Sequence, residues 1–131
     1  MEIQRSHDFE DLAREILAPY LTAYVRPLPE DFALPSVLVT WVGGTARNGI
    51  DTADLTLDAR AEREAEASET LRNALGILRA AAKAGDTEIR HVSVNASGSW
   101  GKDPARPDIA MCTARVTVTG HLEKINLEEK L

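Results

Sequence analysis

The stretch that decides the fold is residues 89–120, IRHVSVNASGSWGKDPARPDIAMCTARVTVTG. Its two ends, residues 89–96 and 109–120, alternate apolar and polar side chains, which is the pattern of half-buried strands. Between them lies a polar segment, residues 97–108, which contains Trp100. Connections in compact domains usually run to about four to six residues, and longer ones are often functional. We therefore predict two strands joined by a loop that contacts a partner.

A second pair of strands is predicted earlier in the chain. Residues 36–42, SVLVTWV, are rich in β-branched side chains, and residues 53–59, ADLTLDA, alternate in polarity. Between them, Asn48 and Gly49 form a dipeptide that is typical of tight hairpin turns. These residues predict an antiparallel hairpin.

The sequence also favours one register for this hairpin. A regular ladder would place Val42 opposite Leu55, whereas a bulge at the glycine pair after Val42 shifts the strand by one residue. A one-residue shift moves every side chain to the other face, so the bulge turns Val37, Val39 and Trp41 toward the core. Because the bulged register buries more apolar surface, we favour it.

Two helices are predicted, one before and one after the hairpin. The first begins near His7, and Pro19 kinks or ends it because proline lacks a backbone donor and clashes one turn back. The apolar stripe of this helix consists of Phe9, Leu12, Ile16 and Tyr20. The second helix, residues 60–84, repeats apolar side chains at helical spacing and ends at Gly85. At 1.5 Å per residue it measures about 36 Å, enough to span the domain.

The order of elements predicts an α+β fold in a single domain, residues 1–131. We expect two layers, in which a long central helix and an N-terminal helix pack on a sheet of about four strands, antiparallel or mixed. Residues 20–35 contain several prolines and are predicted to be irregular, with a short edge strand at Tyr24 and Val25 left open. Residues 121–131, HLEKINLEEKL, are interpreted as a C-terminal extension, either a strand continuation or a short amphipathic helix.

Composition and charge disfavour several classes of protein. The apolar content of 44% and charged content of 27% are globular values. The formal net charge of −6 argues against a general nucleic-acid binder, which needs a basic face. Cys112 is the only cysteine, which leaves no intrachain disulfide and no cysteine-based zinc site. The N-terminus lacks the apolar core of a signal peptide, and no apolar run reaches membrane-spanning length, so we expect a cytoplasmic protein without a membrane partner.

Candidate chemistry is sparse. The glycine-rich segment at residues 43–49 leads into a strand rather than a helix N-terminus, so a hairpin explains it better than a phosphate site. His7, His91 and His121 lack the short spacings of metal sites. No serine lies in a nucleophile elbow, and no Ser/His/Asp or Cys/His set is indicated. We therefore predict a protein that is not an enzyme, with no catalytic, cofactor-binding or metal-binding residue.

Residues 6–120 resemble the tail terminator, or tail completion, proteins of long-tailed bacteriophages. The passages that carry the resemblance are DFEDLAREIL, ALPSVLVTWVGG, DLTLDARAEREAEASETLRNALGILRAA and EIRHVSVNASGSWGKDPARPDIAMCTARVTVTG. They share the plan of helix, hairpin, long helix and hairpin, with a proline-bearing loop before the last strand. Pro19 and the irregular passage after it depart from the family's pattern.

The resemblance implies a structural virion protein that works by shape. Members of that family form hexameric rings that cap the tail tube, stop its elongation and provide the surface that joins the head connector. The implied partners are further copies of the chain, the tail tube protein and the head–tail connector or neck protein. The implied location is the neck-proximal end of the virion tail, after assembly in the host bacterial cytoplasm. DNA would pass through the lumen without specific binding, and an acidic surface suits that passage because it repels phosphate.

Ring contacts of this kind need two different surfaces whose rotation closes. Tryptophan and arginine are enriched at the energetic centres of interfaces, which singles out Trp100 and Arg106. Alternatively, Trp100 anchors its loop to its own domain. Strand edges and residues 121–131 are further candidates. The full set of interface candidates is Trp100, Lys102, Arg106, Arg47, Asn48, His121 and Leu122.

Two alternative functions stay open at this point. The chain could be another head–tail joining or neck protein of similar α+β build. It could also be a small-ligand-binding or enzymatic α+β domain, with its site in a cleft around Trp41, Asp58 and Trp100.

Overall fold

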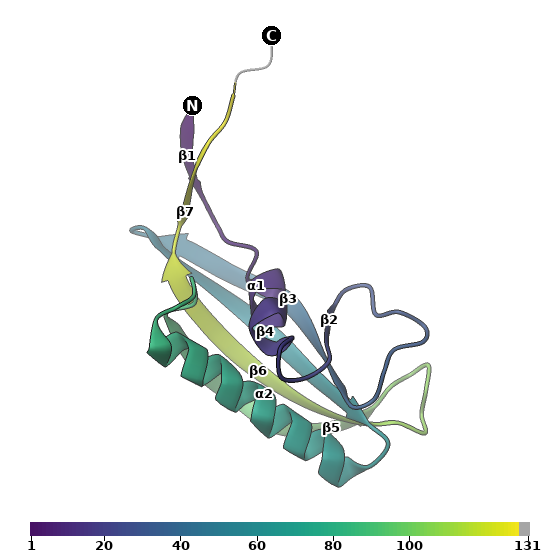
Figure 1. The fold of residues 1–131 in the computed structure, drawn as a ribbon. Coiled ribbons are helices and arrows are strands. Elements are labelled where there is room, and N and C mark those ends of the chain that lie inside the picture. Colours follow the sequence, from purple (N-terminus) through teal and green to yellow (C-terminus); the bar gives the residue numbers. More distant parts are fainter. Residues whose placement is uncertain (129–131) are drawn as a thin grey trace.

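The computed structural model describes residues 1–128, apart from the side chain of Ser97, and has a mixed α+β architecture (Figure 1). The elements are, in order, β1 (Glu2–Arg5), α1 (Phe9–Leu17), β2 (Ala23–Val25), β3 (Ser36–Arg47), β4 (Ile50–Ala61), α2 (Glu64–Ala84), β5 (His91–Lys102), β6 (Ala110–His121) and β7 (Glu123–Asn126). Five strands form the main sheet in the order β2-β3-β4-β6-β5, in which only β2 and β3 are parallel. Both helices cover one face of this sheet (Figure 1).

The predicted α+β class is confirmed, but the prediction of about four strands was wrong. The main sheet gains β2 at its edge, where the short strand at Tyr24 and Val25 does form. Two further strands, β1 and β7, pair with each other outside the main sheet. The arrangement around the helices also differs, because β1 precedes α1 and β2 separates α1 from the hairpin. β1 and β2, with four and three residues, are too short to show a clear alternation of apolar and polar residues in the sequence.

The predicted hairpin turn and the predicted helix end are both present, and their residues have the left-handed backbone that these positions need. Asn48 (φ 54°) and Gly49 (φ 78°) join β3 to β4, with Arg47 opposite Ile50. Positive φ at both central residues is the requirement of a type I′ hairpin turn. Gly85 (φ 76°) ends α2, as the sequence predicts.

The bulged register of the β3–β4 hairpin is confirmed, with one exception. The ladder shifts between Trp41 and Gly43, and Val37 and Val39 are fully buried. Trp41 faces the same side of β3 but is 51% exposed, so its predicted core position was wrong. The reason is that it lies at the N-terminal end of α1, where its backbone N–H donates to Glu10 (2.7 Å), and the helix covers it only in part.

Half of the polar segment at residues 97–108 is strand and not loop, which corrects the prediction. β5 continues to Lys102, and only residues 103–109 connect it to β6. The ladder is irregular between Val94 and Ser99, where two register shifts occur. These shifts disturb the alternation of apolar and polar residues, so the sequence pattern of a strand ends although the pairing continues.

The first helix begins two residues after His7, close to its predicted start, whereas the long helix begins later than predicted. α1 begins at Phe9 after Asp8, whose carboxylate accepts a hydrogen bond from the Asp11 backbone N–H (3.0 Å) and so caps the helix. The long helix begins at Glu64 and not at Arg60, because β4 extends past Arg60 and ends at Ala61. Arg60 was predicted to begin the helix because it is a charged residue directly after an alternating segment. In the structure, β4 continues to Ala61 beneath a loop.

The core lies between the helices and the main sheet. Its side chains come from alternate positions of β3, β4 and β6 and from one stripe of each helix. Small residues such as Ala59 and Ala114 line the sheet under α2, which allows close packing. Cys112 is buried among them, and burial raises the pKa of its thiol. On α1 the buried stripe is Phe9, Ala13 and Leu17.

The stripe predicted for α1 was therefore only partly right. Phe9 is buried as expected, but Leu12 and Ile16 are half-buried at the side of the helix, and Tyr20 is 74% exposed beyond its end. α1 packs on the sheet through Ala13 and Leu17, so Leu12 and Ile16 face the space beside α2. This rotation leaves apolar side chains at the surface between the two helices.

Candidate interaction surfaces

The chain termini form an antiparallel ribbon that stands clear of the body (Figure 1). We call β1, β7 and the adjoining Met1 and Leu127 the terminal ribbon. Arg5 pairs with Glu123 at its base, with 2.9 Å between Nε and Oε2. At its tip the amino group of Met1 donates to the carbonyl of Leu127 (2.7 Å). The strand interpretation of the C-terminal extension is confirmed for Glu123–Asn126, whereas residues 129–131 lie outside the described part of the chain.

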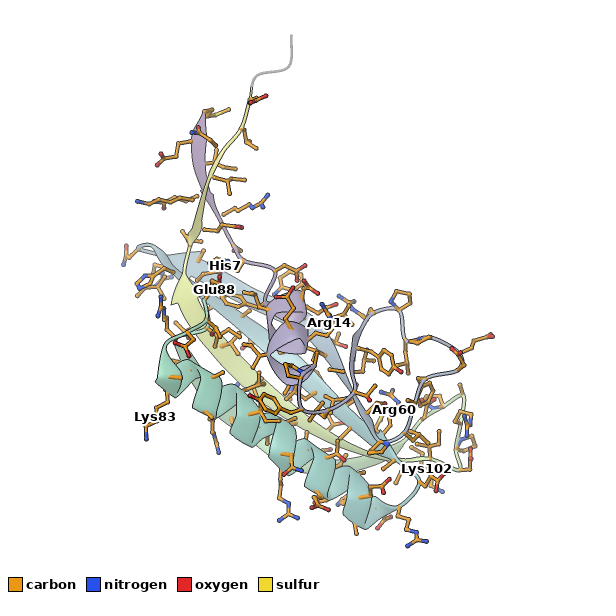
Figure 2. All side chains as sticks on the ribbon, in the orientation of Figure 1. His7, Arg14, Arg60, Lys83, Glu88 and Lys102 are labelled. Carbon is orange, nitrogen blue, oxygen red and sulfur yellow. The ribbon has the colours of Figure 1, made fainter. Side chains whose placement is uncertain are left out.

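One face of the terminal ribbon is apolar. Ile3 lies directly opposite Ile125, and residues at alternate positions along a strand share its face. Met1 (71% exposed) and Leu127 (43% exposed) extend this face toward the tip. Figure 2 shows the side chains of the ribbon projecting without a packed neighbour. An isolated two-stranded ribbon is marginally stable in water, so its apolar face is a candidate contact surface.

A groove runs between α1 and α2, and we call it the helix groove. It has a volume of about 1280 Å³. Leu12 and Ile16 line it from α1, and Ile77 and Ala80 line it from α2. Tyr20 lies on the same surface beyond the end of α1. The helix groove is thus a second apolar surface, on the covered side of the sheet.

A buried ion pair fixes the loop at the far end of the sheet. Arg60 Nε lies 2.9 Å from Asp103 Oδ2, and both side chains are buried. The same carboxylate accepts hydrogen bonds from the backbone N–H groups of Ala105 (2.8 Å) and Arg106 (3.3 Å). The guanidinium also lies over the Phe32 ring, 6.0 Å from its centroid. These contacts join the loop at residues 103–109 to β4.

The electrostatics of this pair favour the charged carboxylate. Burial raises the pKa of Asp103, but the Ala105 N–H and the Arg60 guanidinium outweigh burial, so its pKa lies below the ordinary value. Arg60 Nη1 is buried without a hydrogen-bond partner among the described residues. Sequence reasoning missed the pair, because Arg60 was assigned to the helix and Asp103 to an exposed loop. No sequence pattern indicates the pair, because the predicted strand, residues 53–59, ends before Arg60.

The seven predicted interface residues fall into two groups at opposite ends of the main sheet. Trp100, Lys102 and Arg106 lie at the end where α2 begins, and Figure 2 shows Lys102 near Arg60 there. Trp100 is 50% exposed and lies directly opposite buried Cys112. All three side chains of this group are exposed.

The second group lies where the terminal ribbon leaves the body. Arg47 and Asn48 form the tip of the β3–β4 hairpin. His121 is paired with Ile50, and the Leu122 backbone N–H donates to the Gly49 carbonyl (3.0 Å). Their sequence positions are far apart, and the β4–β6 ladder brings them together. The group consists of Arg47, Asn48, His121 and Leu122, of which Leu122 alone is half-buried.

The structure does not assemble the predicted cleft around Trp41, Asp58 and Trp100. Asp58 lies on the open face of the sheet, where its carboxylate accepts a hydrogen bond from the Thr113 hydroxyl (2.7 Å). Trp41 lies on the opposite face, beside the start of α1. Trp100 lies at the end of β5. The fold therefore separates the three residues, and this version of a small-ligand site was wrong.

The open face of the sheet is polar and internally bonded. The Thr117 hydroxyl donates to Asp54 (2.7 Å), and the Asn95 amide donates to the Thr117 hydroxyl (2.6 Å). Within residues 1–128, no three His, Cys, Asp or Glu side chains gather closely enough to hold a metal ion. In the same part of the chain, neither helix is long and apolar enough to cross a membrane.

Comparison with models of known protein families found no match, and comparison with curated proteins found none either.

Proposed function

We propose that this chain is a tail terminator of a long-tailed bacteriophage. In this proposal it is a structural virion protein that assembles as a homohexameric ring at the neck-proximal end of the tail. The ring caps the tail tube, ends its elongation and joins it to the head connector. The sequence resemblance over residues 6–120 is the starting point of the proposal.

The observation that carries the proposal is the terminal ribbon. Its apolar face, with Ile3 opposite Ile125, stands clear of the body and has no packed neighbour within the described residues. An apolar face of this kind, without a packed neighbour, is a candidate for protein–protein contact. The helix groove offers a second, different apolar surface on the same chain. Two different surfaces on one subunit are the requirement for a ring.

The positions of the interface candidates fit a subunit with two axial contacts. Trp100 and Arg106 lie at one end of the main sheet, and Arg47 and His121 lie at the other. A ring subunit between a tail tube and a connector must present one surface to each. The net charge of −6 suits a ring whose lumen passes DNA without holding it.

Native mass spectrometry together with a tail-assembly reaction tests the proposal. We expect a hexamer, or a monomer that becomes hexameric at high concentration or on tail tubes. Tubes grown with the protein present should be uniform in length, and negative-stain microscopy should show a ring at one tip. A strict monomer that leaves tube length unchanged would contradict the proposal. Binding to head connectors alone would assign the chain to the neck proteins instead.

A further inference from the structure

A pocket of about 400 Å³ lies between the start of α1 and the β3–β4 hairpin, and we call it the Asp51 pocket. Its volume is within the range of about 300–1,000 Å³ that is usual for small-ligand sites. The lining combines aromatic rings with carboxylates, and these belong to His7, Phe9, Trp41, Asp8, Glu10 and Asp51. Figure 2 shows His7 at this place, where the terminal ribbon meets the body.

The Asp51 carboxylate is buried without a cationic partner. Asp51 is 2% exposed, and its Oδ2 accepts one hydrogen bond, from the backbone N–H of His7 (2.9 Å). Within residues 1–128, no lysine, arginine or histidine side chain forms an ion pair with it. Buried aspartates are almost always paired, because burial of an unpaired charge is costly. The chain therefore leaves a buried carboxylate that a cation from another molecule would neutralise.

The second carboxylate oxygen of Asp51 is accessible from the pocket. Its Oδ1 accepts no hydrogen bond from the described residues. In that part of the chain, Arg60 Nη1 is the only side-chain polar atom that is both fully enclosed and without a partner, so Oδ1 of Asp51 is not enclosed. Because Asp51 lines the pocket, this oxygen can accept a hydrogen bond from a bound ligand.

The charge of the lining favours a cation over an anion. Three carboxylates line the pocket, and no lysine or arginine of the described chain does. Arg26 lies outside the lining and pairs with one of the three, Glu10 (3.2 Å). The N-terminal end of α1 contributes about half a positive charge, which on its own would favour an anion. The two remaining carboxylates, of Asp8 and Asp51, outweigh it.

The Trp41 ring makes an organic cation a better fit than a metal ion. Trp41 lines the pocket and is 51% exposed, so a ligand can reach its indole. Ammonium and guanidinium groups are attracted to the face of a tryptophan ring and form strong hydrogen bonds with carboxylates. A divalent metal ion would instead need several oxygen ligands around it. One accessible carboxylate oxygen beside an aromatic ring is the combination that suits an organic cation.

We propose that the Asp51 pocket binds an organic cation, an ammonium or guanidinium group that pairs with Asp51 and lies against the Trp41 ring. Two sources supply this chemistry, namely a free polyamine and the lysine or arginine side chain of a partner protein, and binding measurements distinguish them. The site goes beyond the proposed function and is independent of it, because a single chain forms the whole pocket.

Titration followed by heteronuclear NMR tests the binding. The probes are Nα-acetyl-lysine amide, Nα-acetyl-arginine amide and spermidine, and Nα-acetyl-norleucine amide is the uncharged control. We expect the cations to shift the indole N–H signal of Trp41 and the backbone N–H signals of residues 44–46 saturably, and the norleucine derivative to leave them unchanged. Saturation by none of the cations, equal shifts with norleucine, or tighter binding of calcium ions than of every organic cation would overturn the site.

The same titrations distinguish the two sources of the cation. Tighter binding of spermidine than of both amino-acid derivatives would support the site and identify a free polyamine as its ligand. Binding of the lysine or arginine derivative at least as tight as that of spermidine would support the site and identify a protein side chain.

Asp51→Asn tests the carboxylate. The asparagine keeps an oxygen that can accept the His7 N–H and removes the charge. Asp54→Asn is the matched control, because it removes the same charge from the open face of the sheet, where Asp54 accepts a hydrogen bond from the Thr117 hydroxyl. We expect Asp51→Asn to weaken binding of the cations about tenfold, because a hydrogen bond between two charged groups is lost. The control should bind them like the unaltered protein.

Trp41→Leu tests the ring without altering a buried residue, since Trp41 is half-exposed. We expect binding of the cations to weaken about threefold, the effect of one cation–π contact at an accessible site. Trp41→Phe keeps an aromatic face and should retain most of the binding. Circular dichroism and thermal unfolding verify the fold of every variant, and the Trp41 pair decides alone if Asp51→Asn does not fold. Unchanged binding in Trp41→Leu, or in folded Asp51→Asn, would overturn the site.

Discussion

The Arg60–Asp103 ion pair holds the loop at residues 103–109 to the end of the main sheet. Both side chains are buried, with 2.9 Å between Nε and Oδ2. Removal of one partner leaves the other charge buried without compensation, so Asp103→Asn should lower the free energy of unfolding by about 3 kcal/mol. Urea unfolding measures the loss. Asp108→Asn is the matched control, because Asp108 pairs with Arg106 at the exposed surface (3.4 Å), and it should change stability far less.

The same carboxylate makes stability depend on pH. The folded pKa of Asp103 lies below its ordinary value of 3.8, so the unfolded chain binds the proton more tightly. The stabilisation by Asp103 is therefore complete above pH 3.8 and is lost as the pH falls through the lowered folded pKa. We expect the stability difference between the unaltered protein and Asp103→Asn to shrink as the pH falls below 3.8. Urea unfolding over a pH series would contradict the assignment if the difference stayed constant.

For single residues, the sequence predicts the face of a strand on which a side chain lies better than it predicts how exposed that side chain is. Val37, Val39 and Trp41 were all assigned to the core side of β3, and all three lie on that side. Trp41 is half-exposed because coverage depends on where α1 starts, and that start is fixed by the Asp8 cap. Periodicity within one strand contains no information on the end of a neighbouring helix.

The long helix α2 supports the core through a continuous inner stripe. Leu75 lies in this stripe and is buried among sheet residues and the other helix. Leu75→Asp places an unpaired charge there, and we expect a loss of more than about 4 kcal/mol, which leaves most of the chain unfolded. Asn73→Asp adds the same charge on the exposed side of α2 and should leave the fold intact. Circular dichroism distinguishes the two variants, and a native spectrum for Leu75→Asp would contradict its core position.

Elements were predictable where their signal is local. The β3–β4 hairpin depends on the Asn48-Gly49 turn, and α2 depends on a long apolar stripe and Gly85. β1 was missed because its partner is β7, at the other end of the chain, and four residues carry too little pattern to reveal it. The last half of β5 was missed because two irregularities interrupt its alternation.

For the whole molecule, the sequence allowed candidate interface residues to be chosen by residue type, but it did not predict which of them lie together. Arg47 and His121 are distant in sequence, and only the β4–β6 register brings them to one end. Trp100 and Arg106 were expected in one contact loop, but Trp100 lies in β5 and the Asp103 pair fixes the loop of Arg106. The terminal ribbon and the helix groove were not predicted, because both depend on tertiary packing.

The position of Trp100 leads to a prediction about the assembled particle. Its side chain is 50% exposed at the end of the sheet away from the terminal ribbon, so it contributes little to the core and is available to an axial partner. Trp100→Ala should leave folding nearly intact and weaken attachment of the ring to the tail tube or the connector. Loss of a tryptophan at the centre of an interface costs about 2 kcal/mol, or about thirtyfold in affinity.

Sedimentation of rings with tail tubes, and separately with connectors, measures this attachment, and thermal unfolding measures the fold. Trp100→Phe is the matched control, because it keeps an aromatic side chain of similar shape and should restore most of the binding. A lowered unfolding temperature with normal attachment would instead make Trp100 an anchor of β5 on its own domain. Weak attachment at an unchanged unfolding temperature would place it at an axial interface, because a side chain that only supports the fold cannot affect binding without affecting stability.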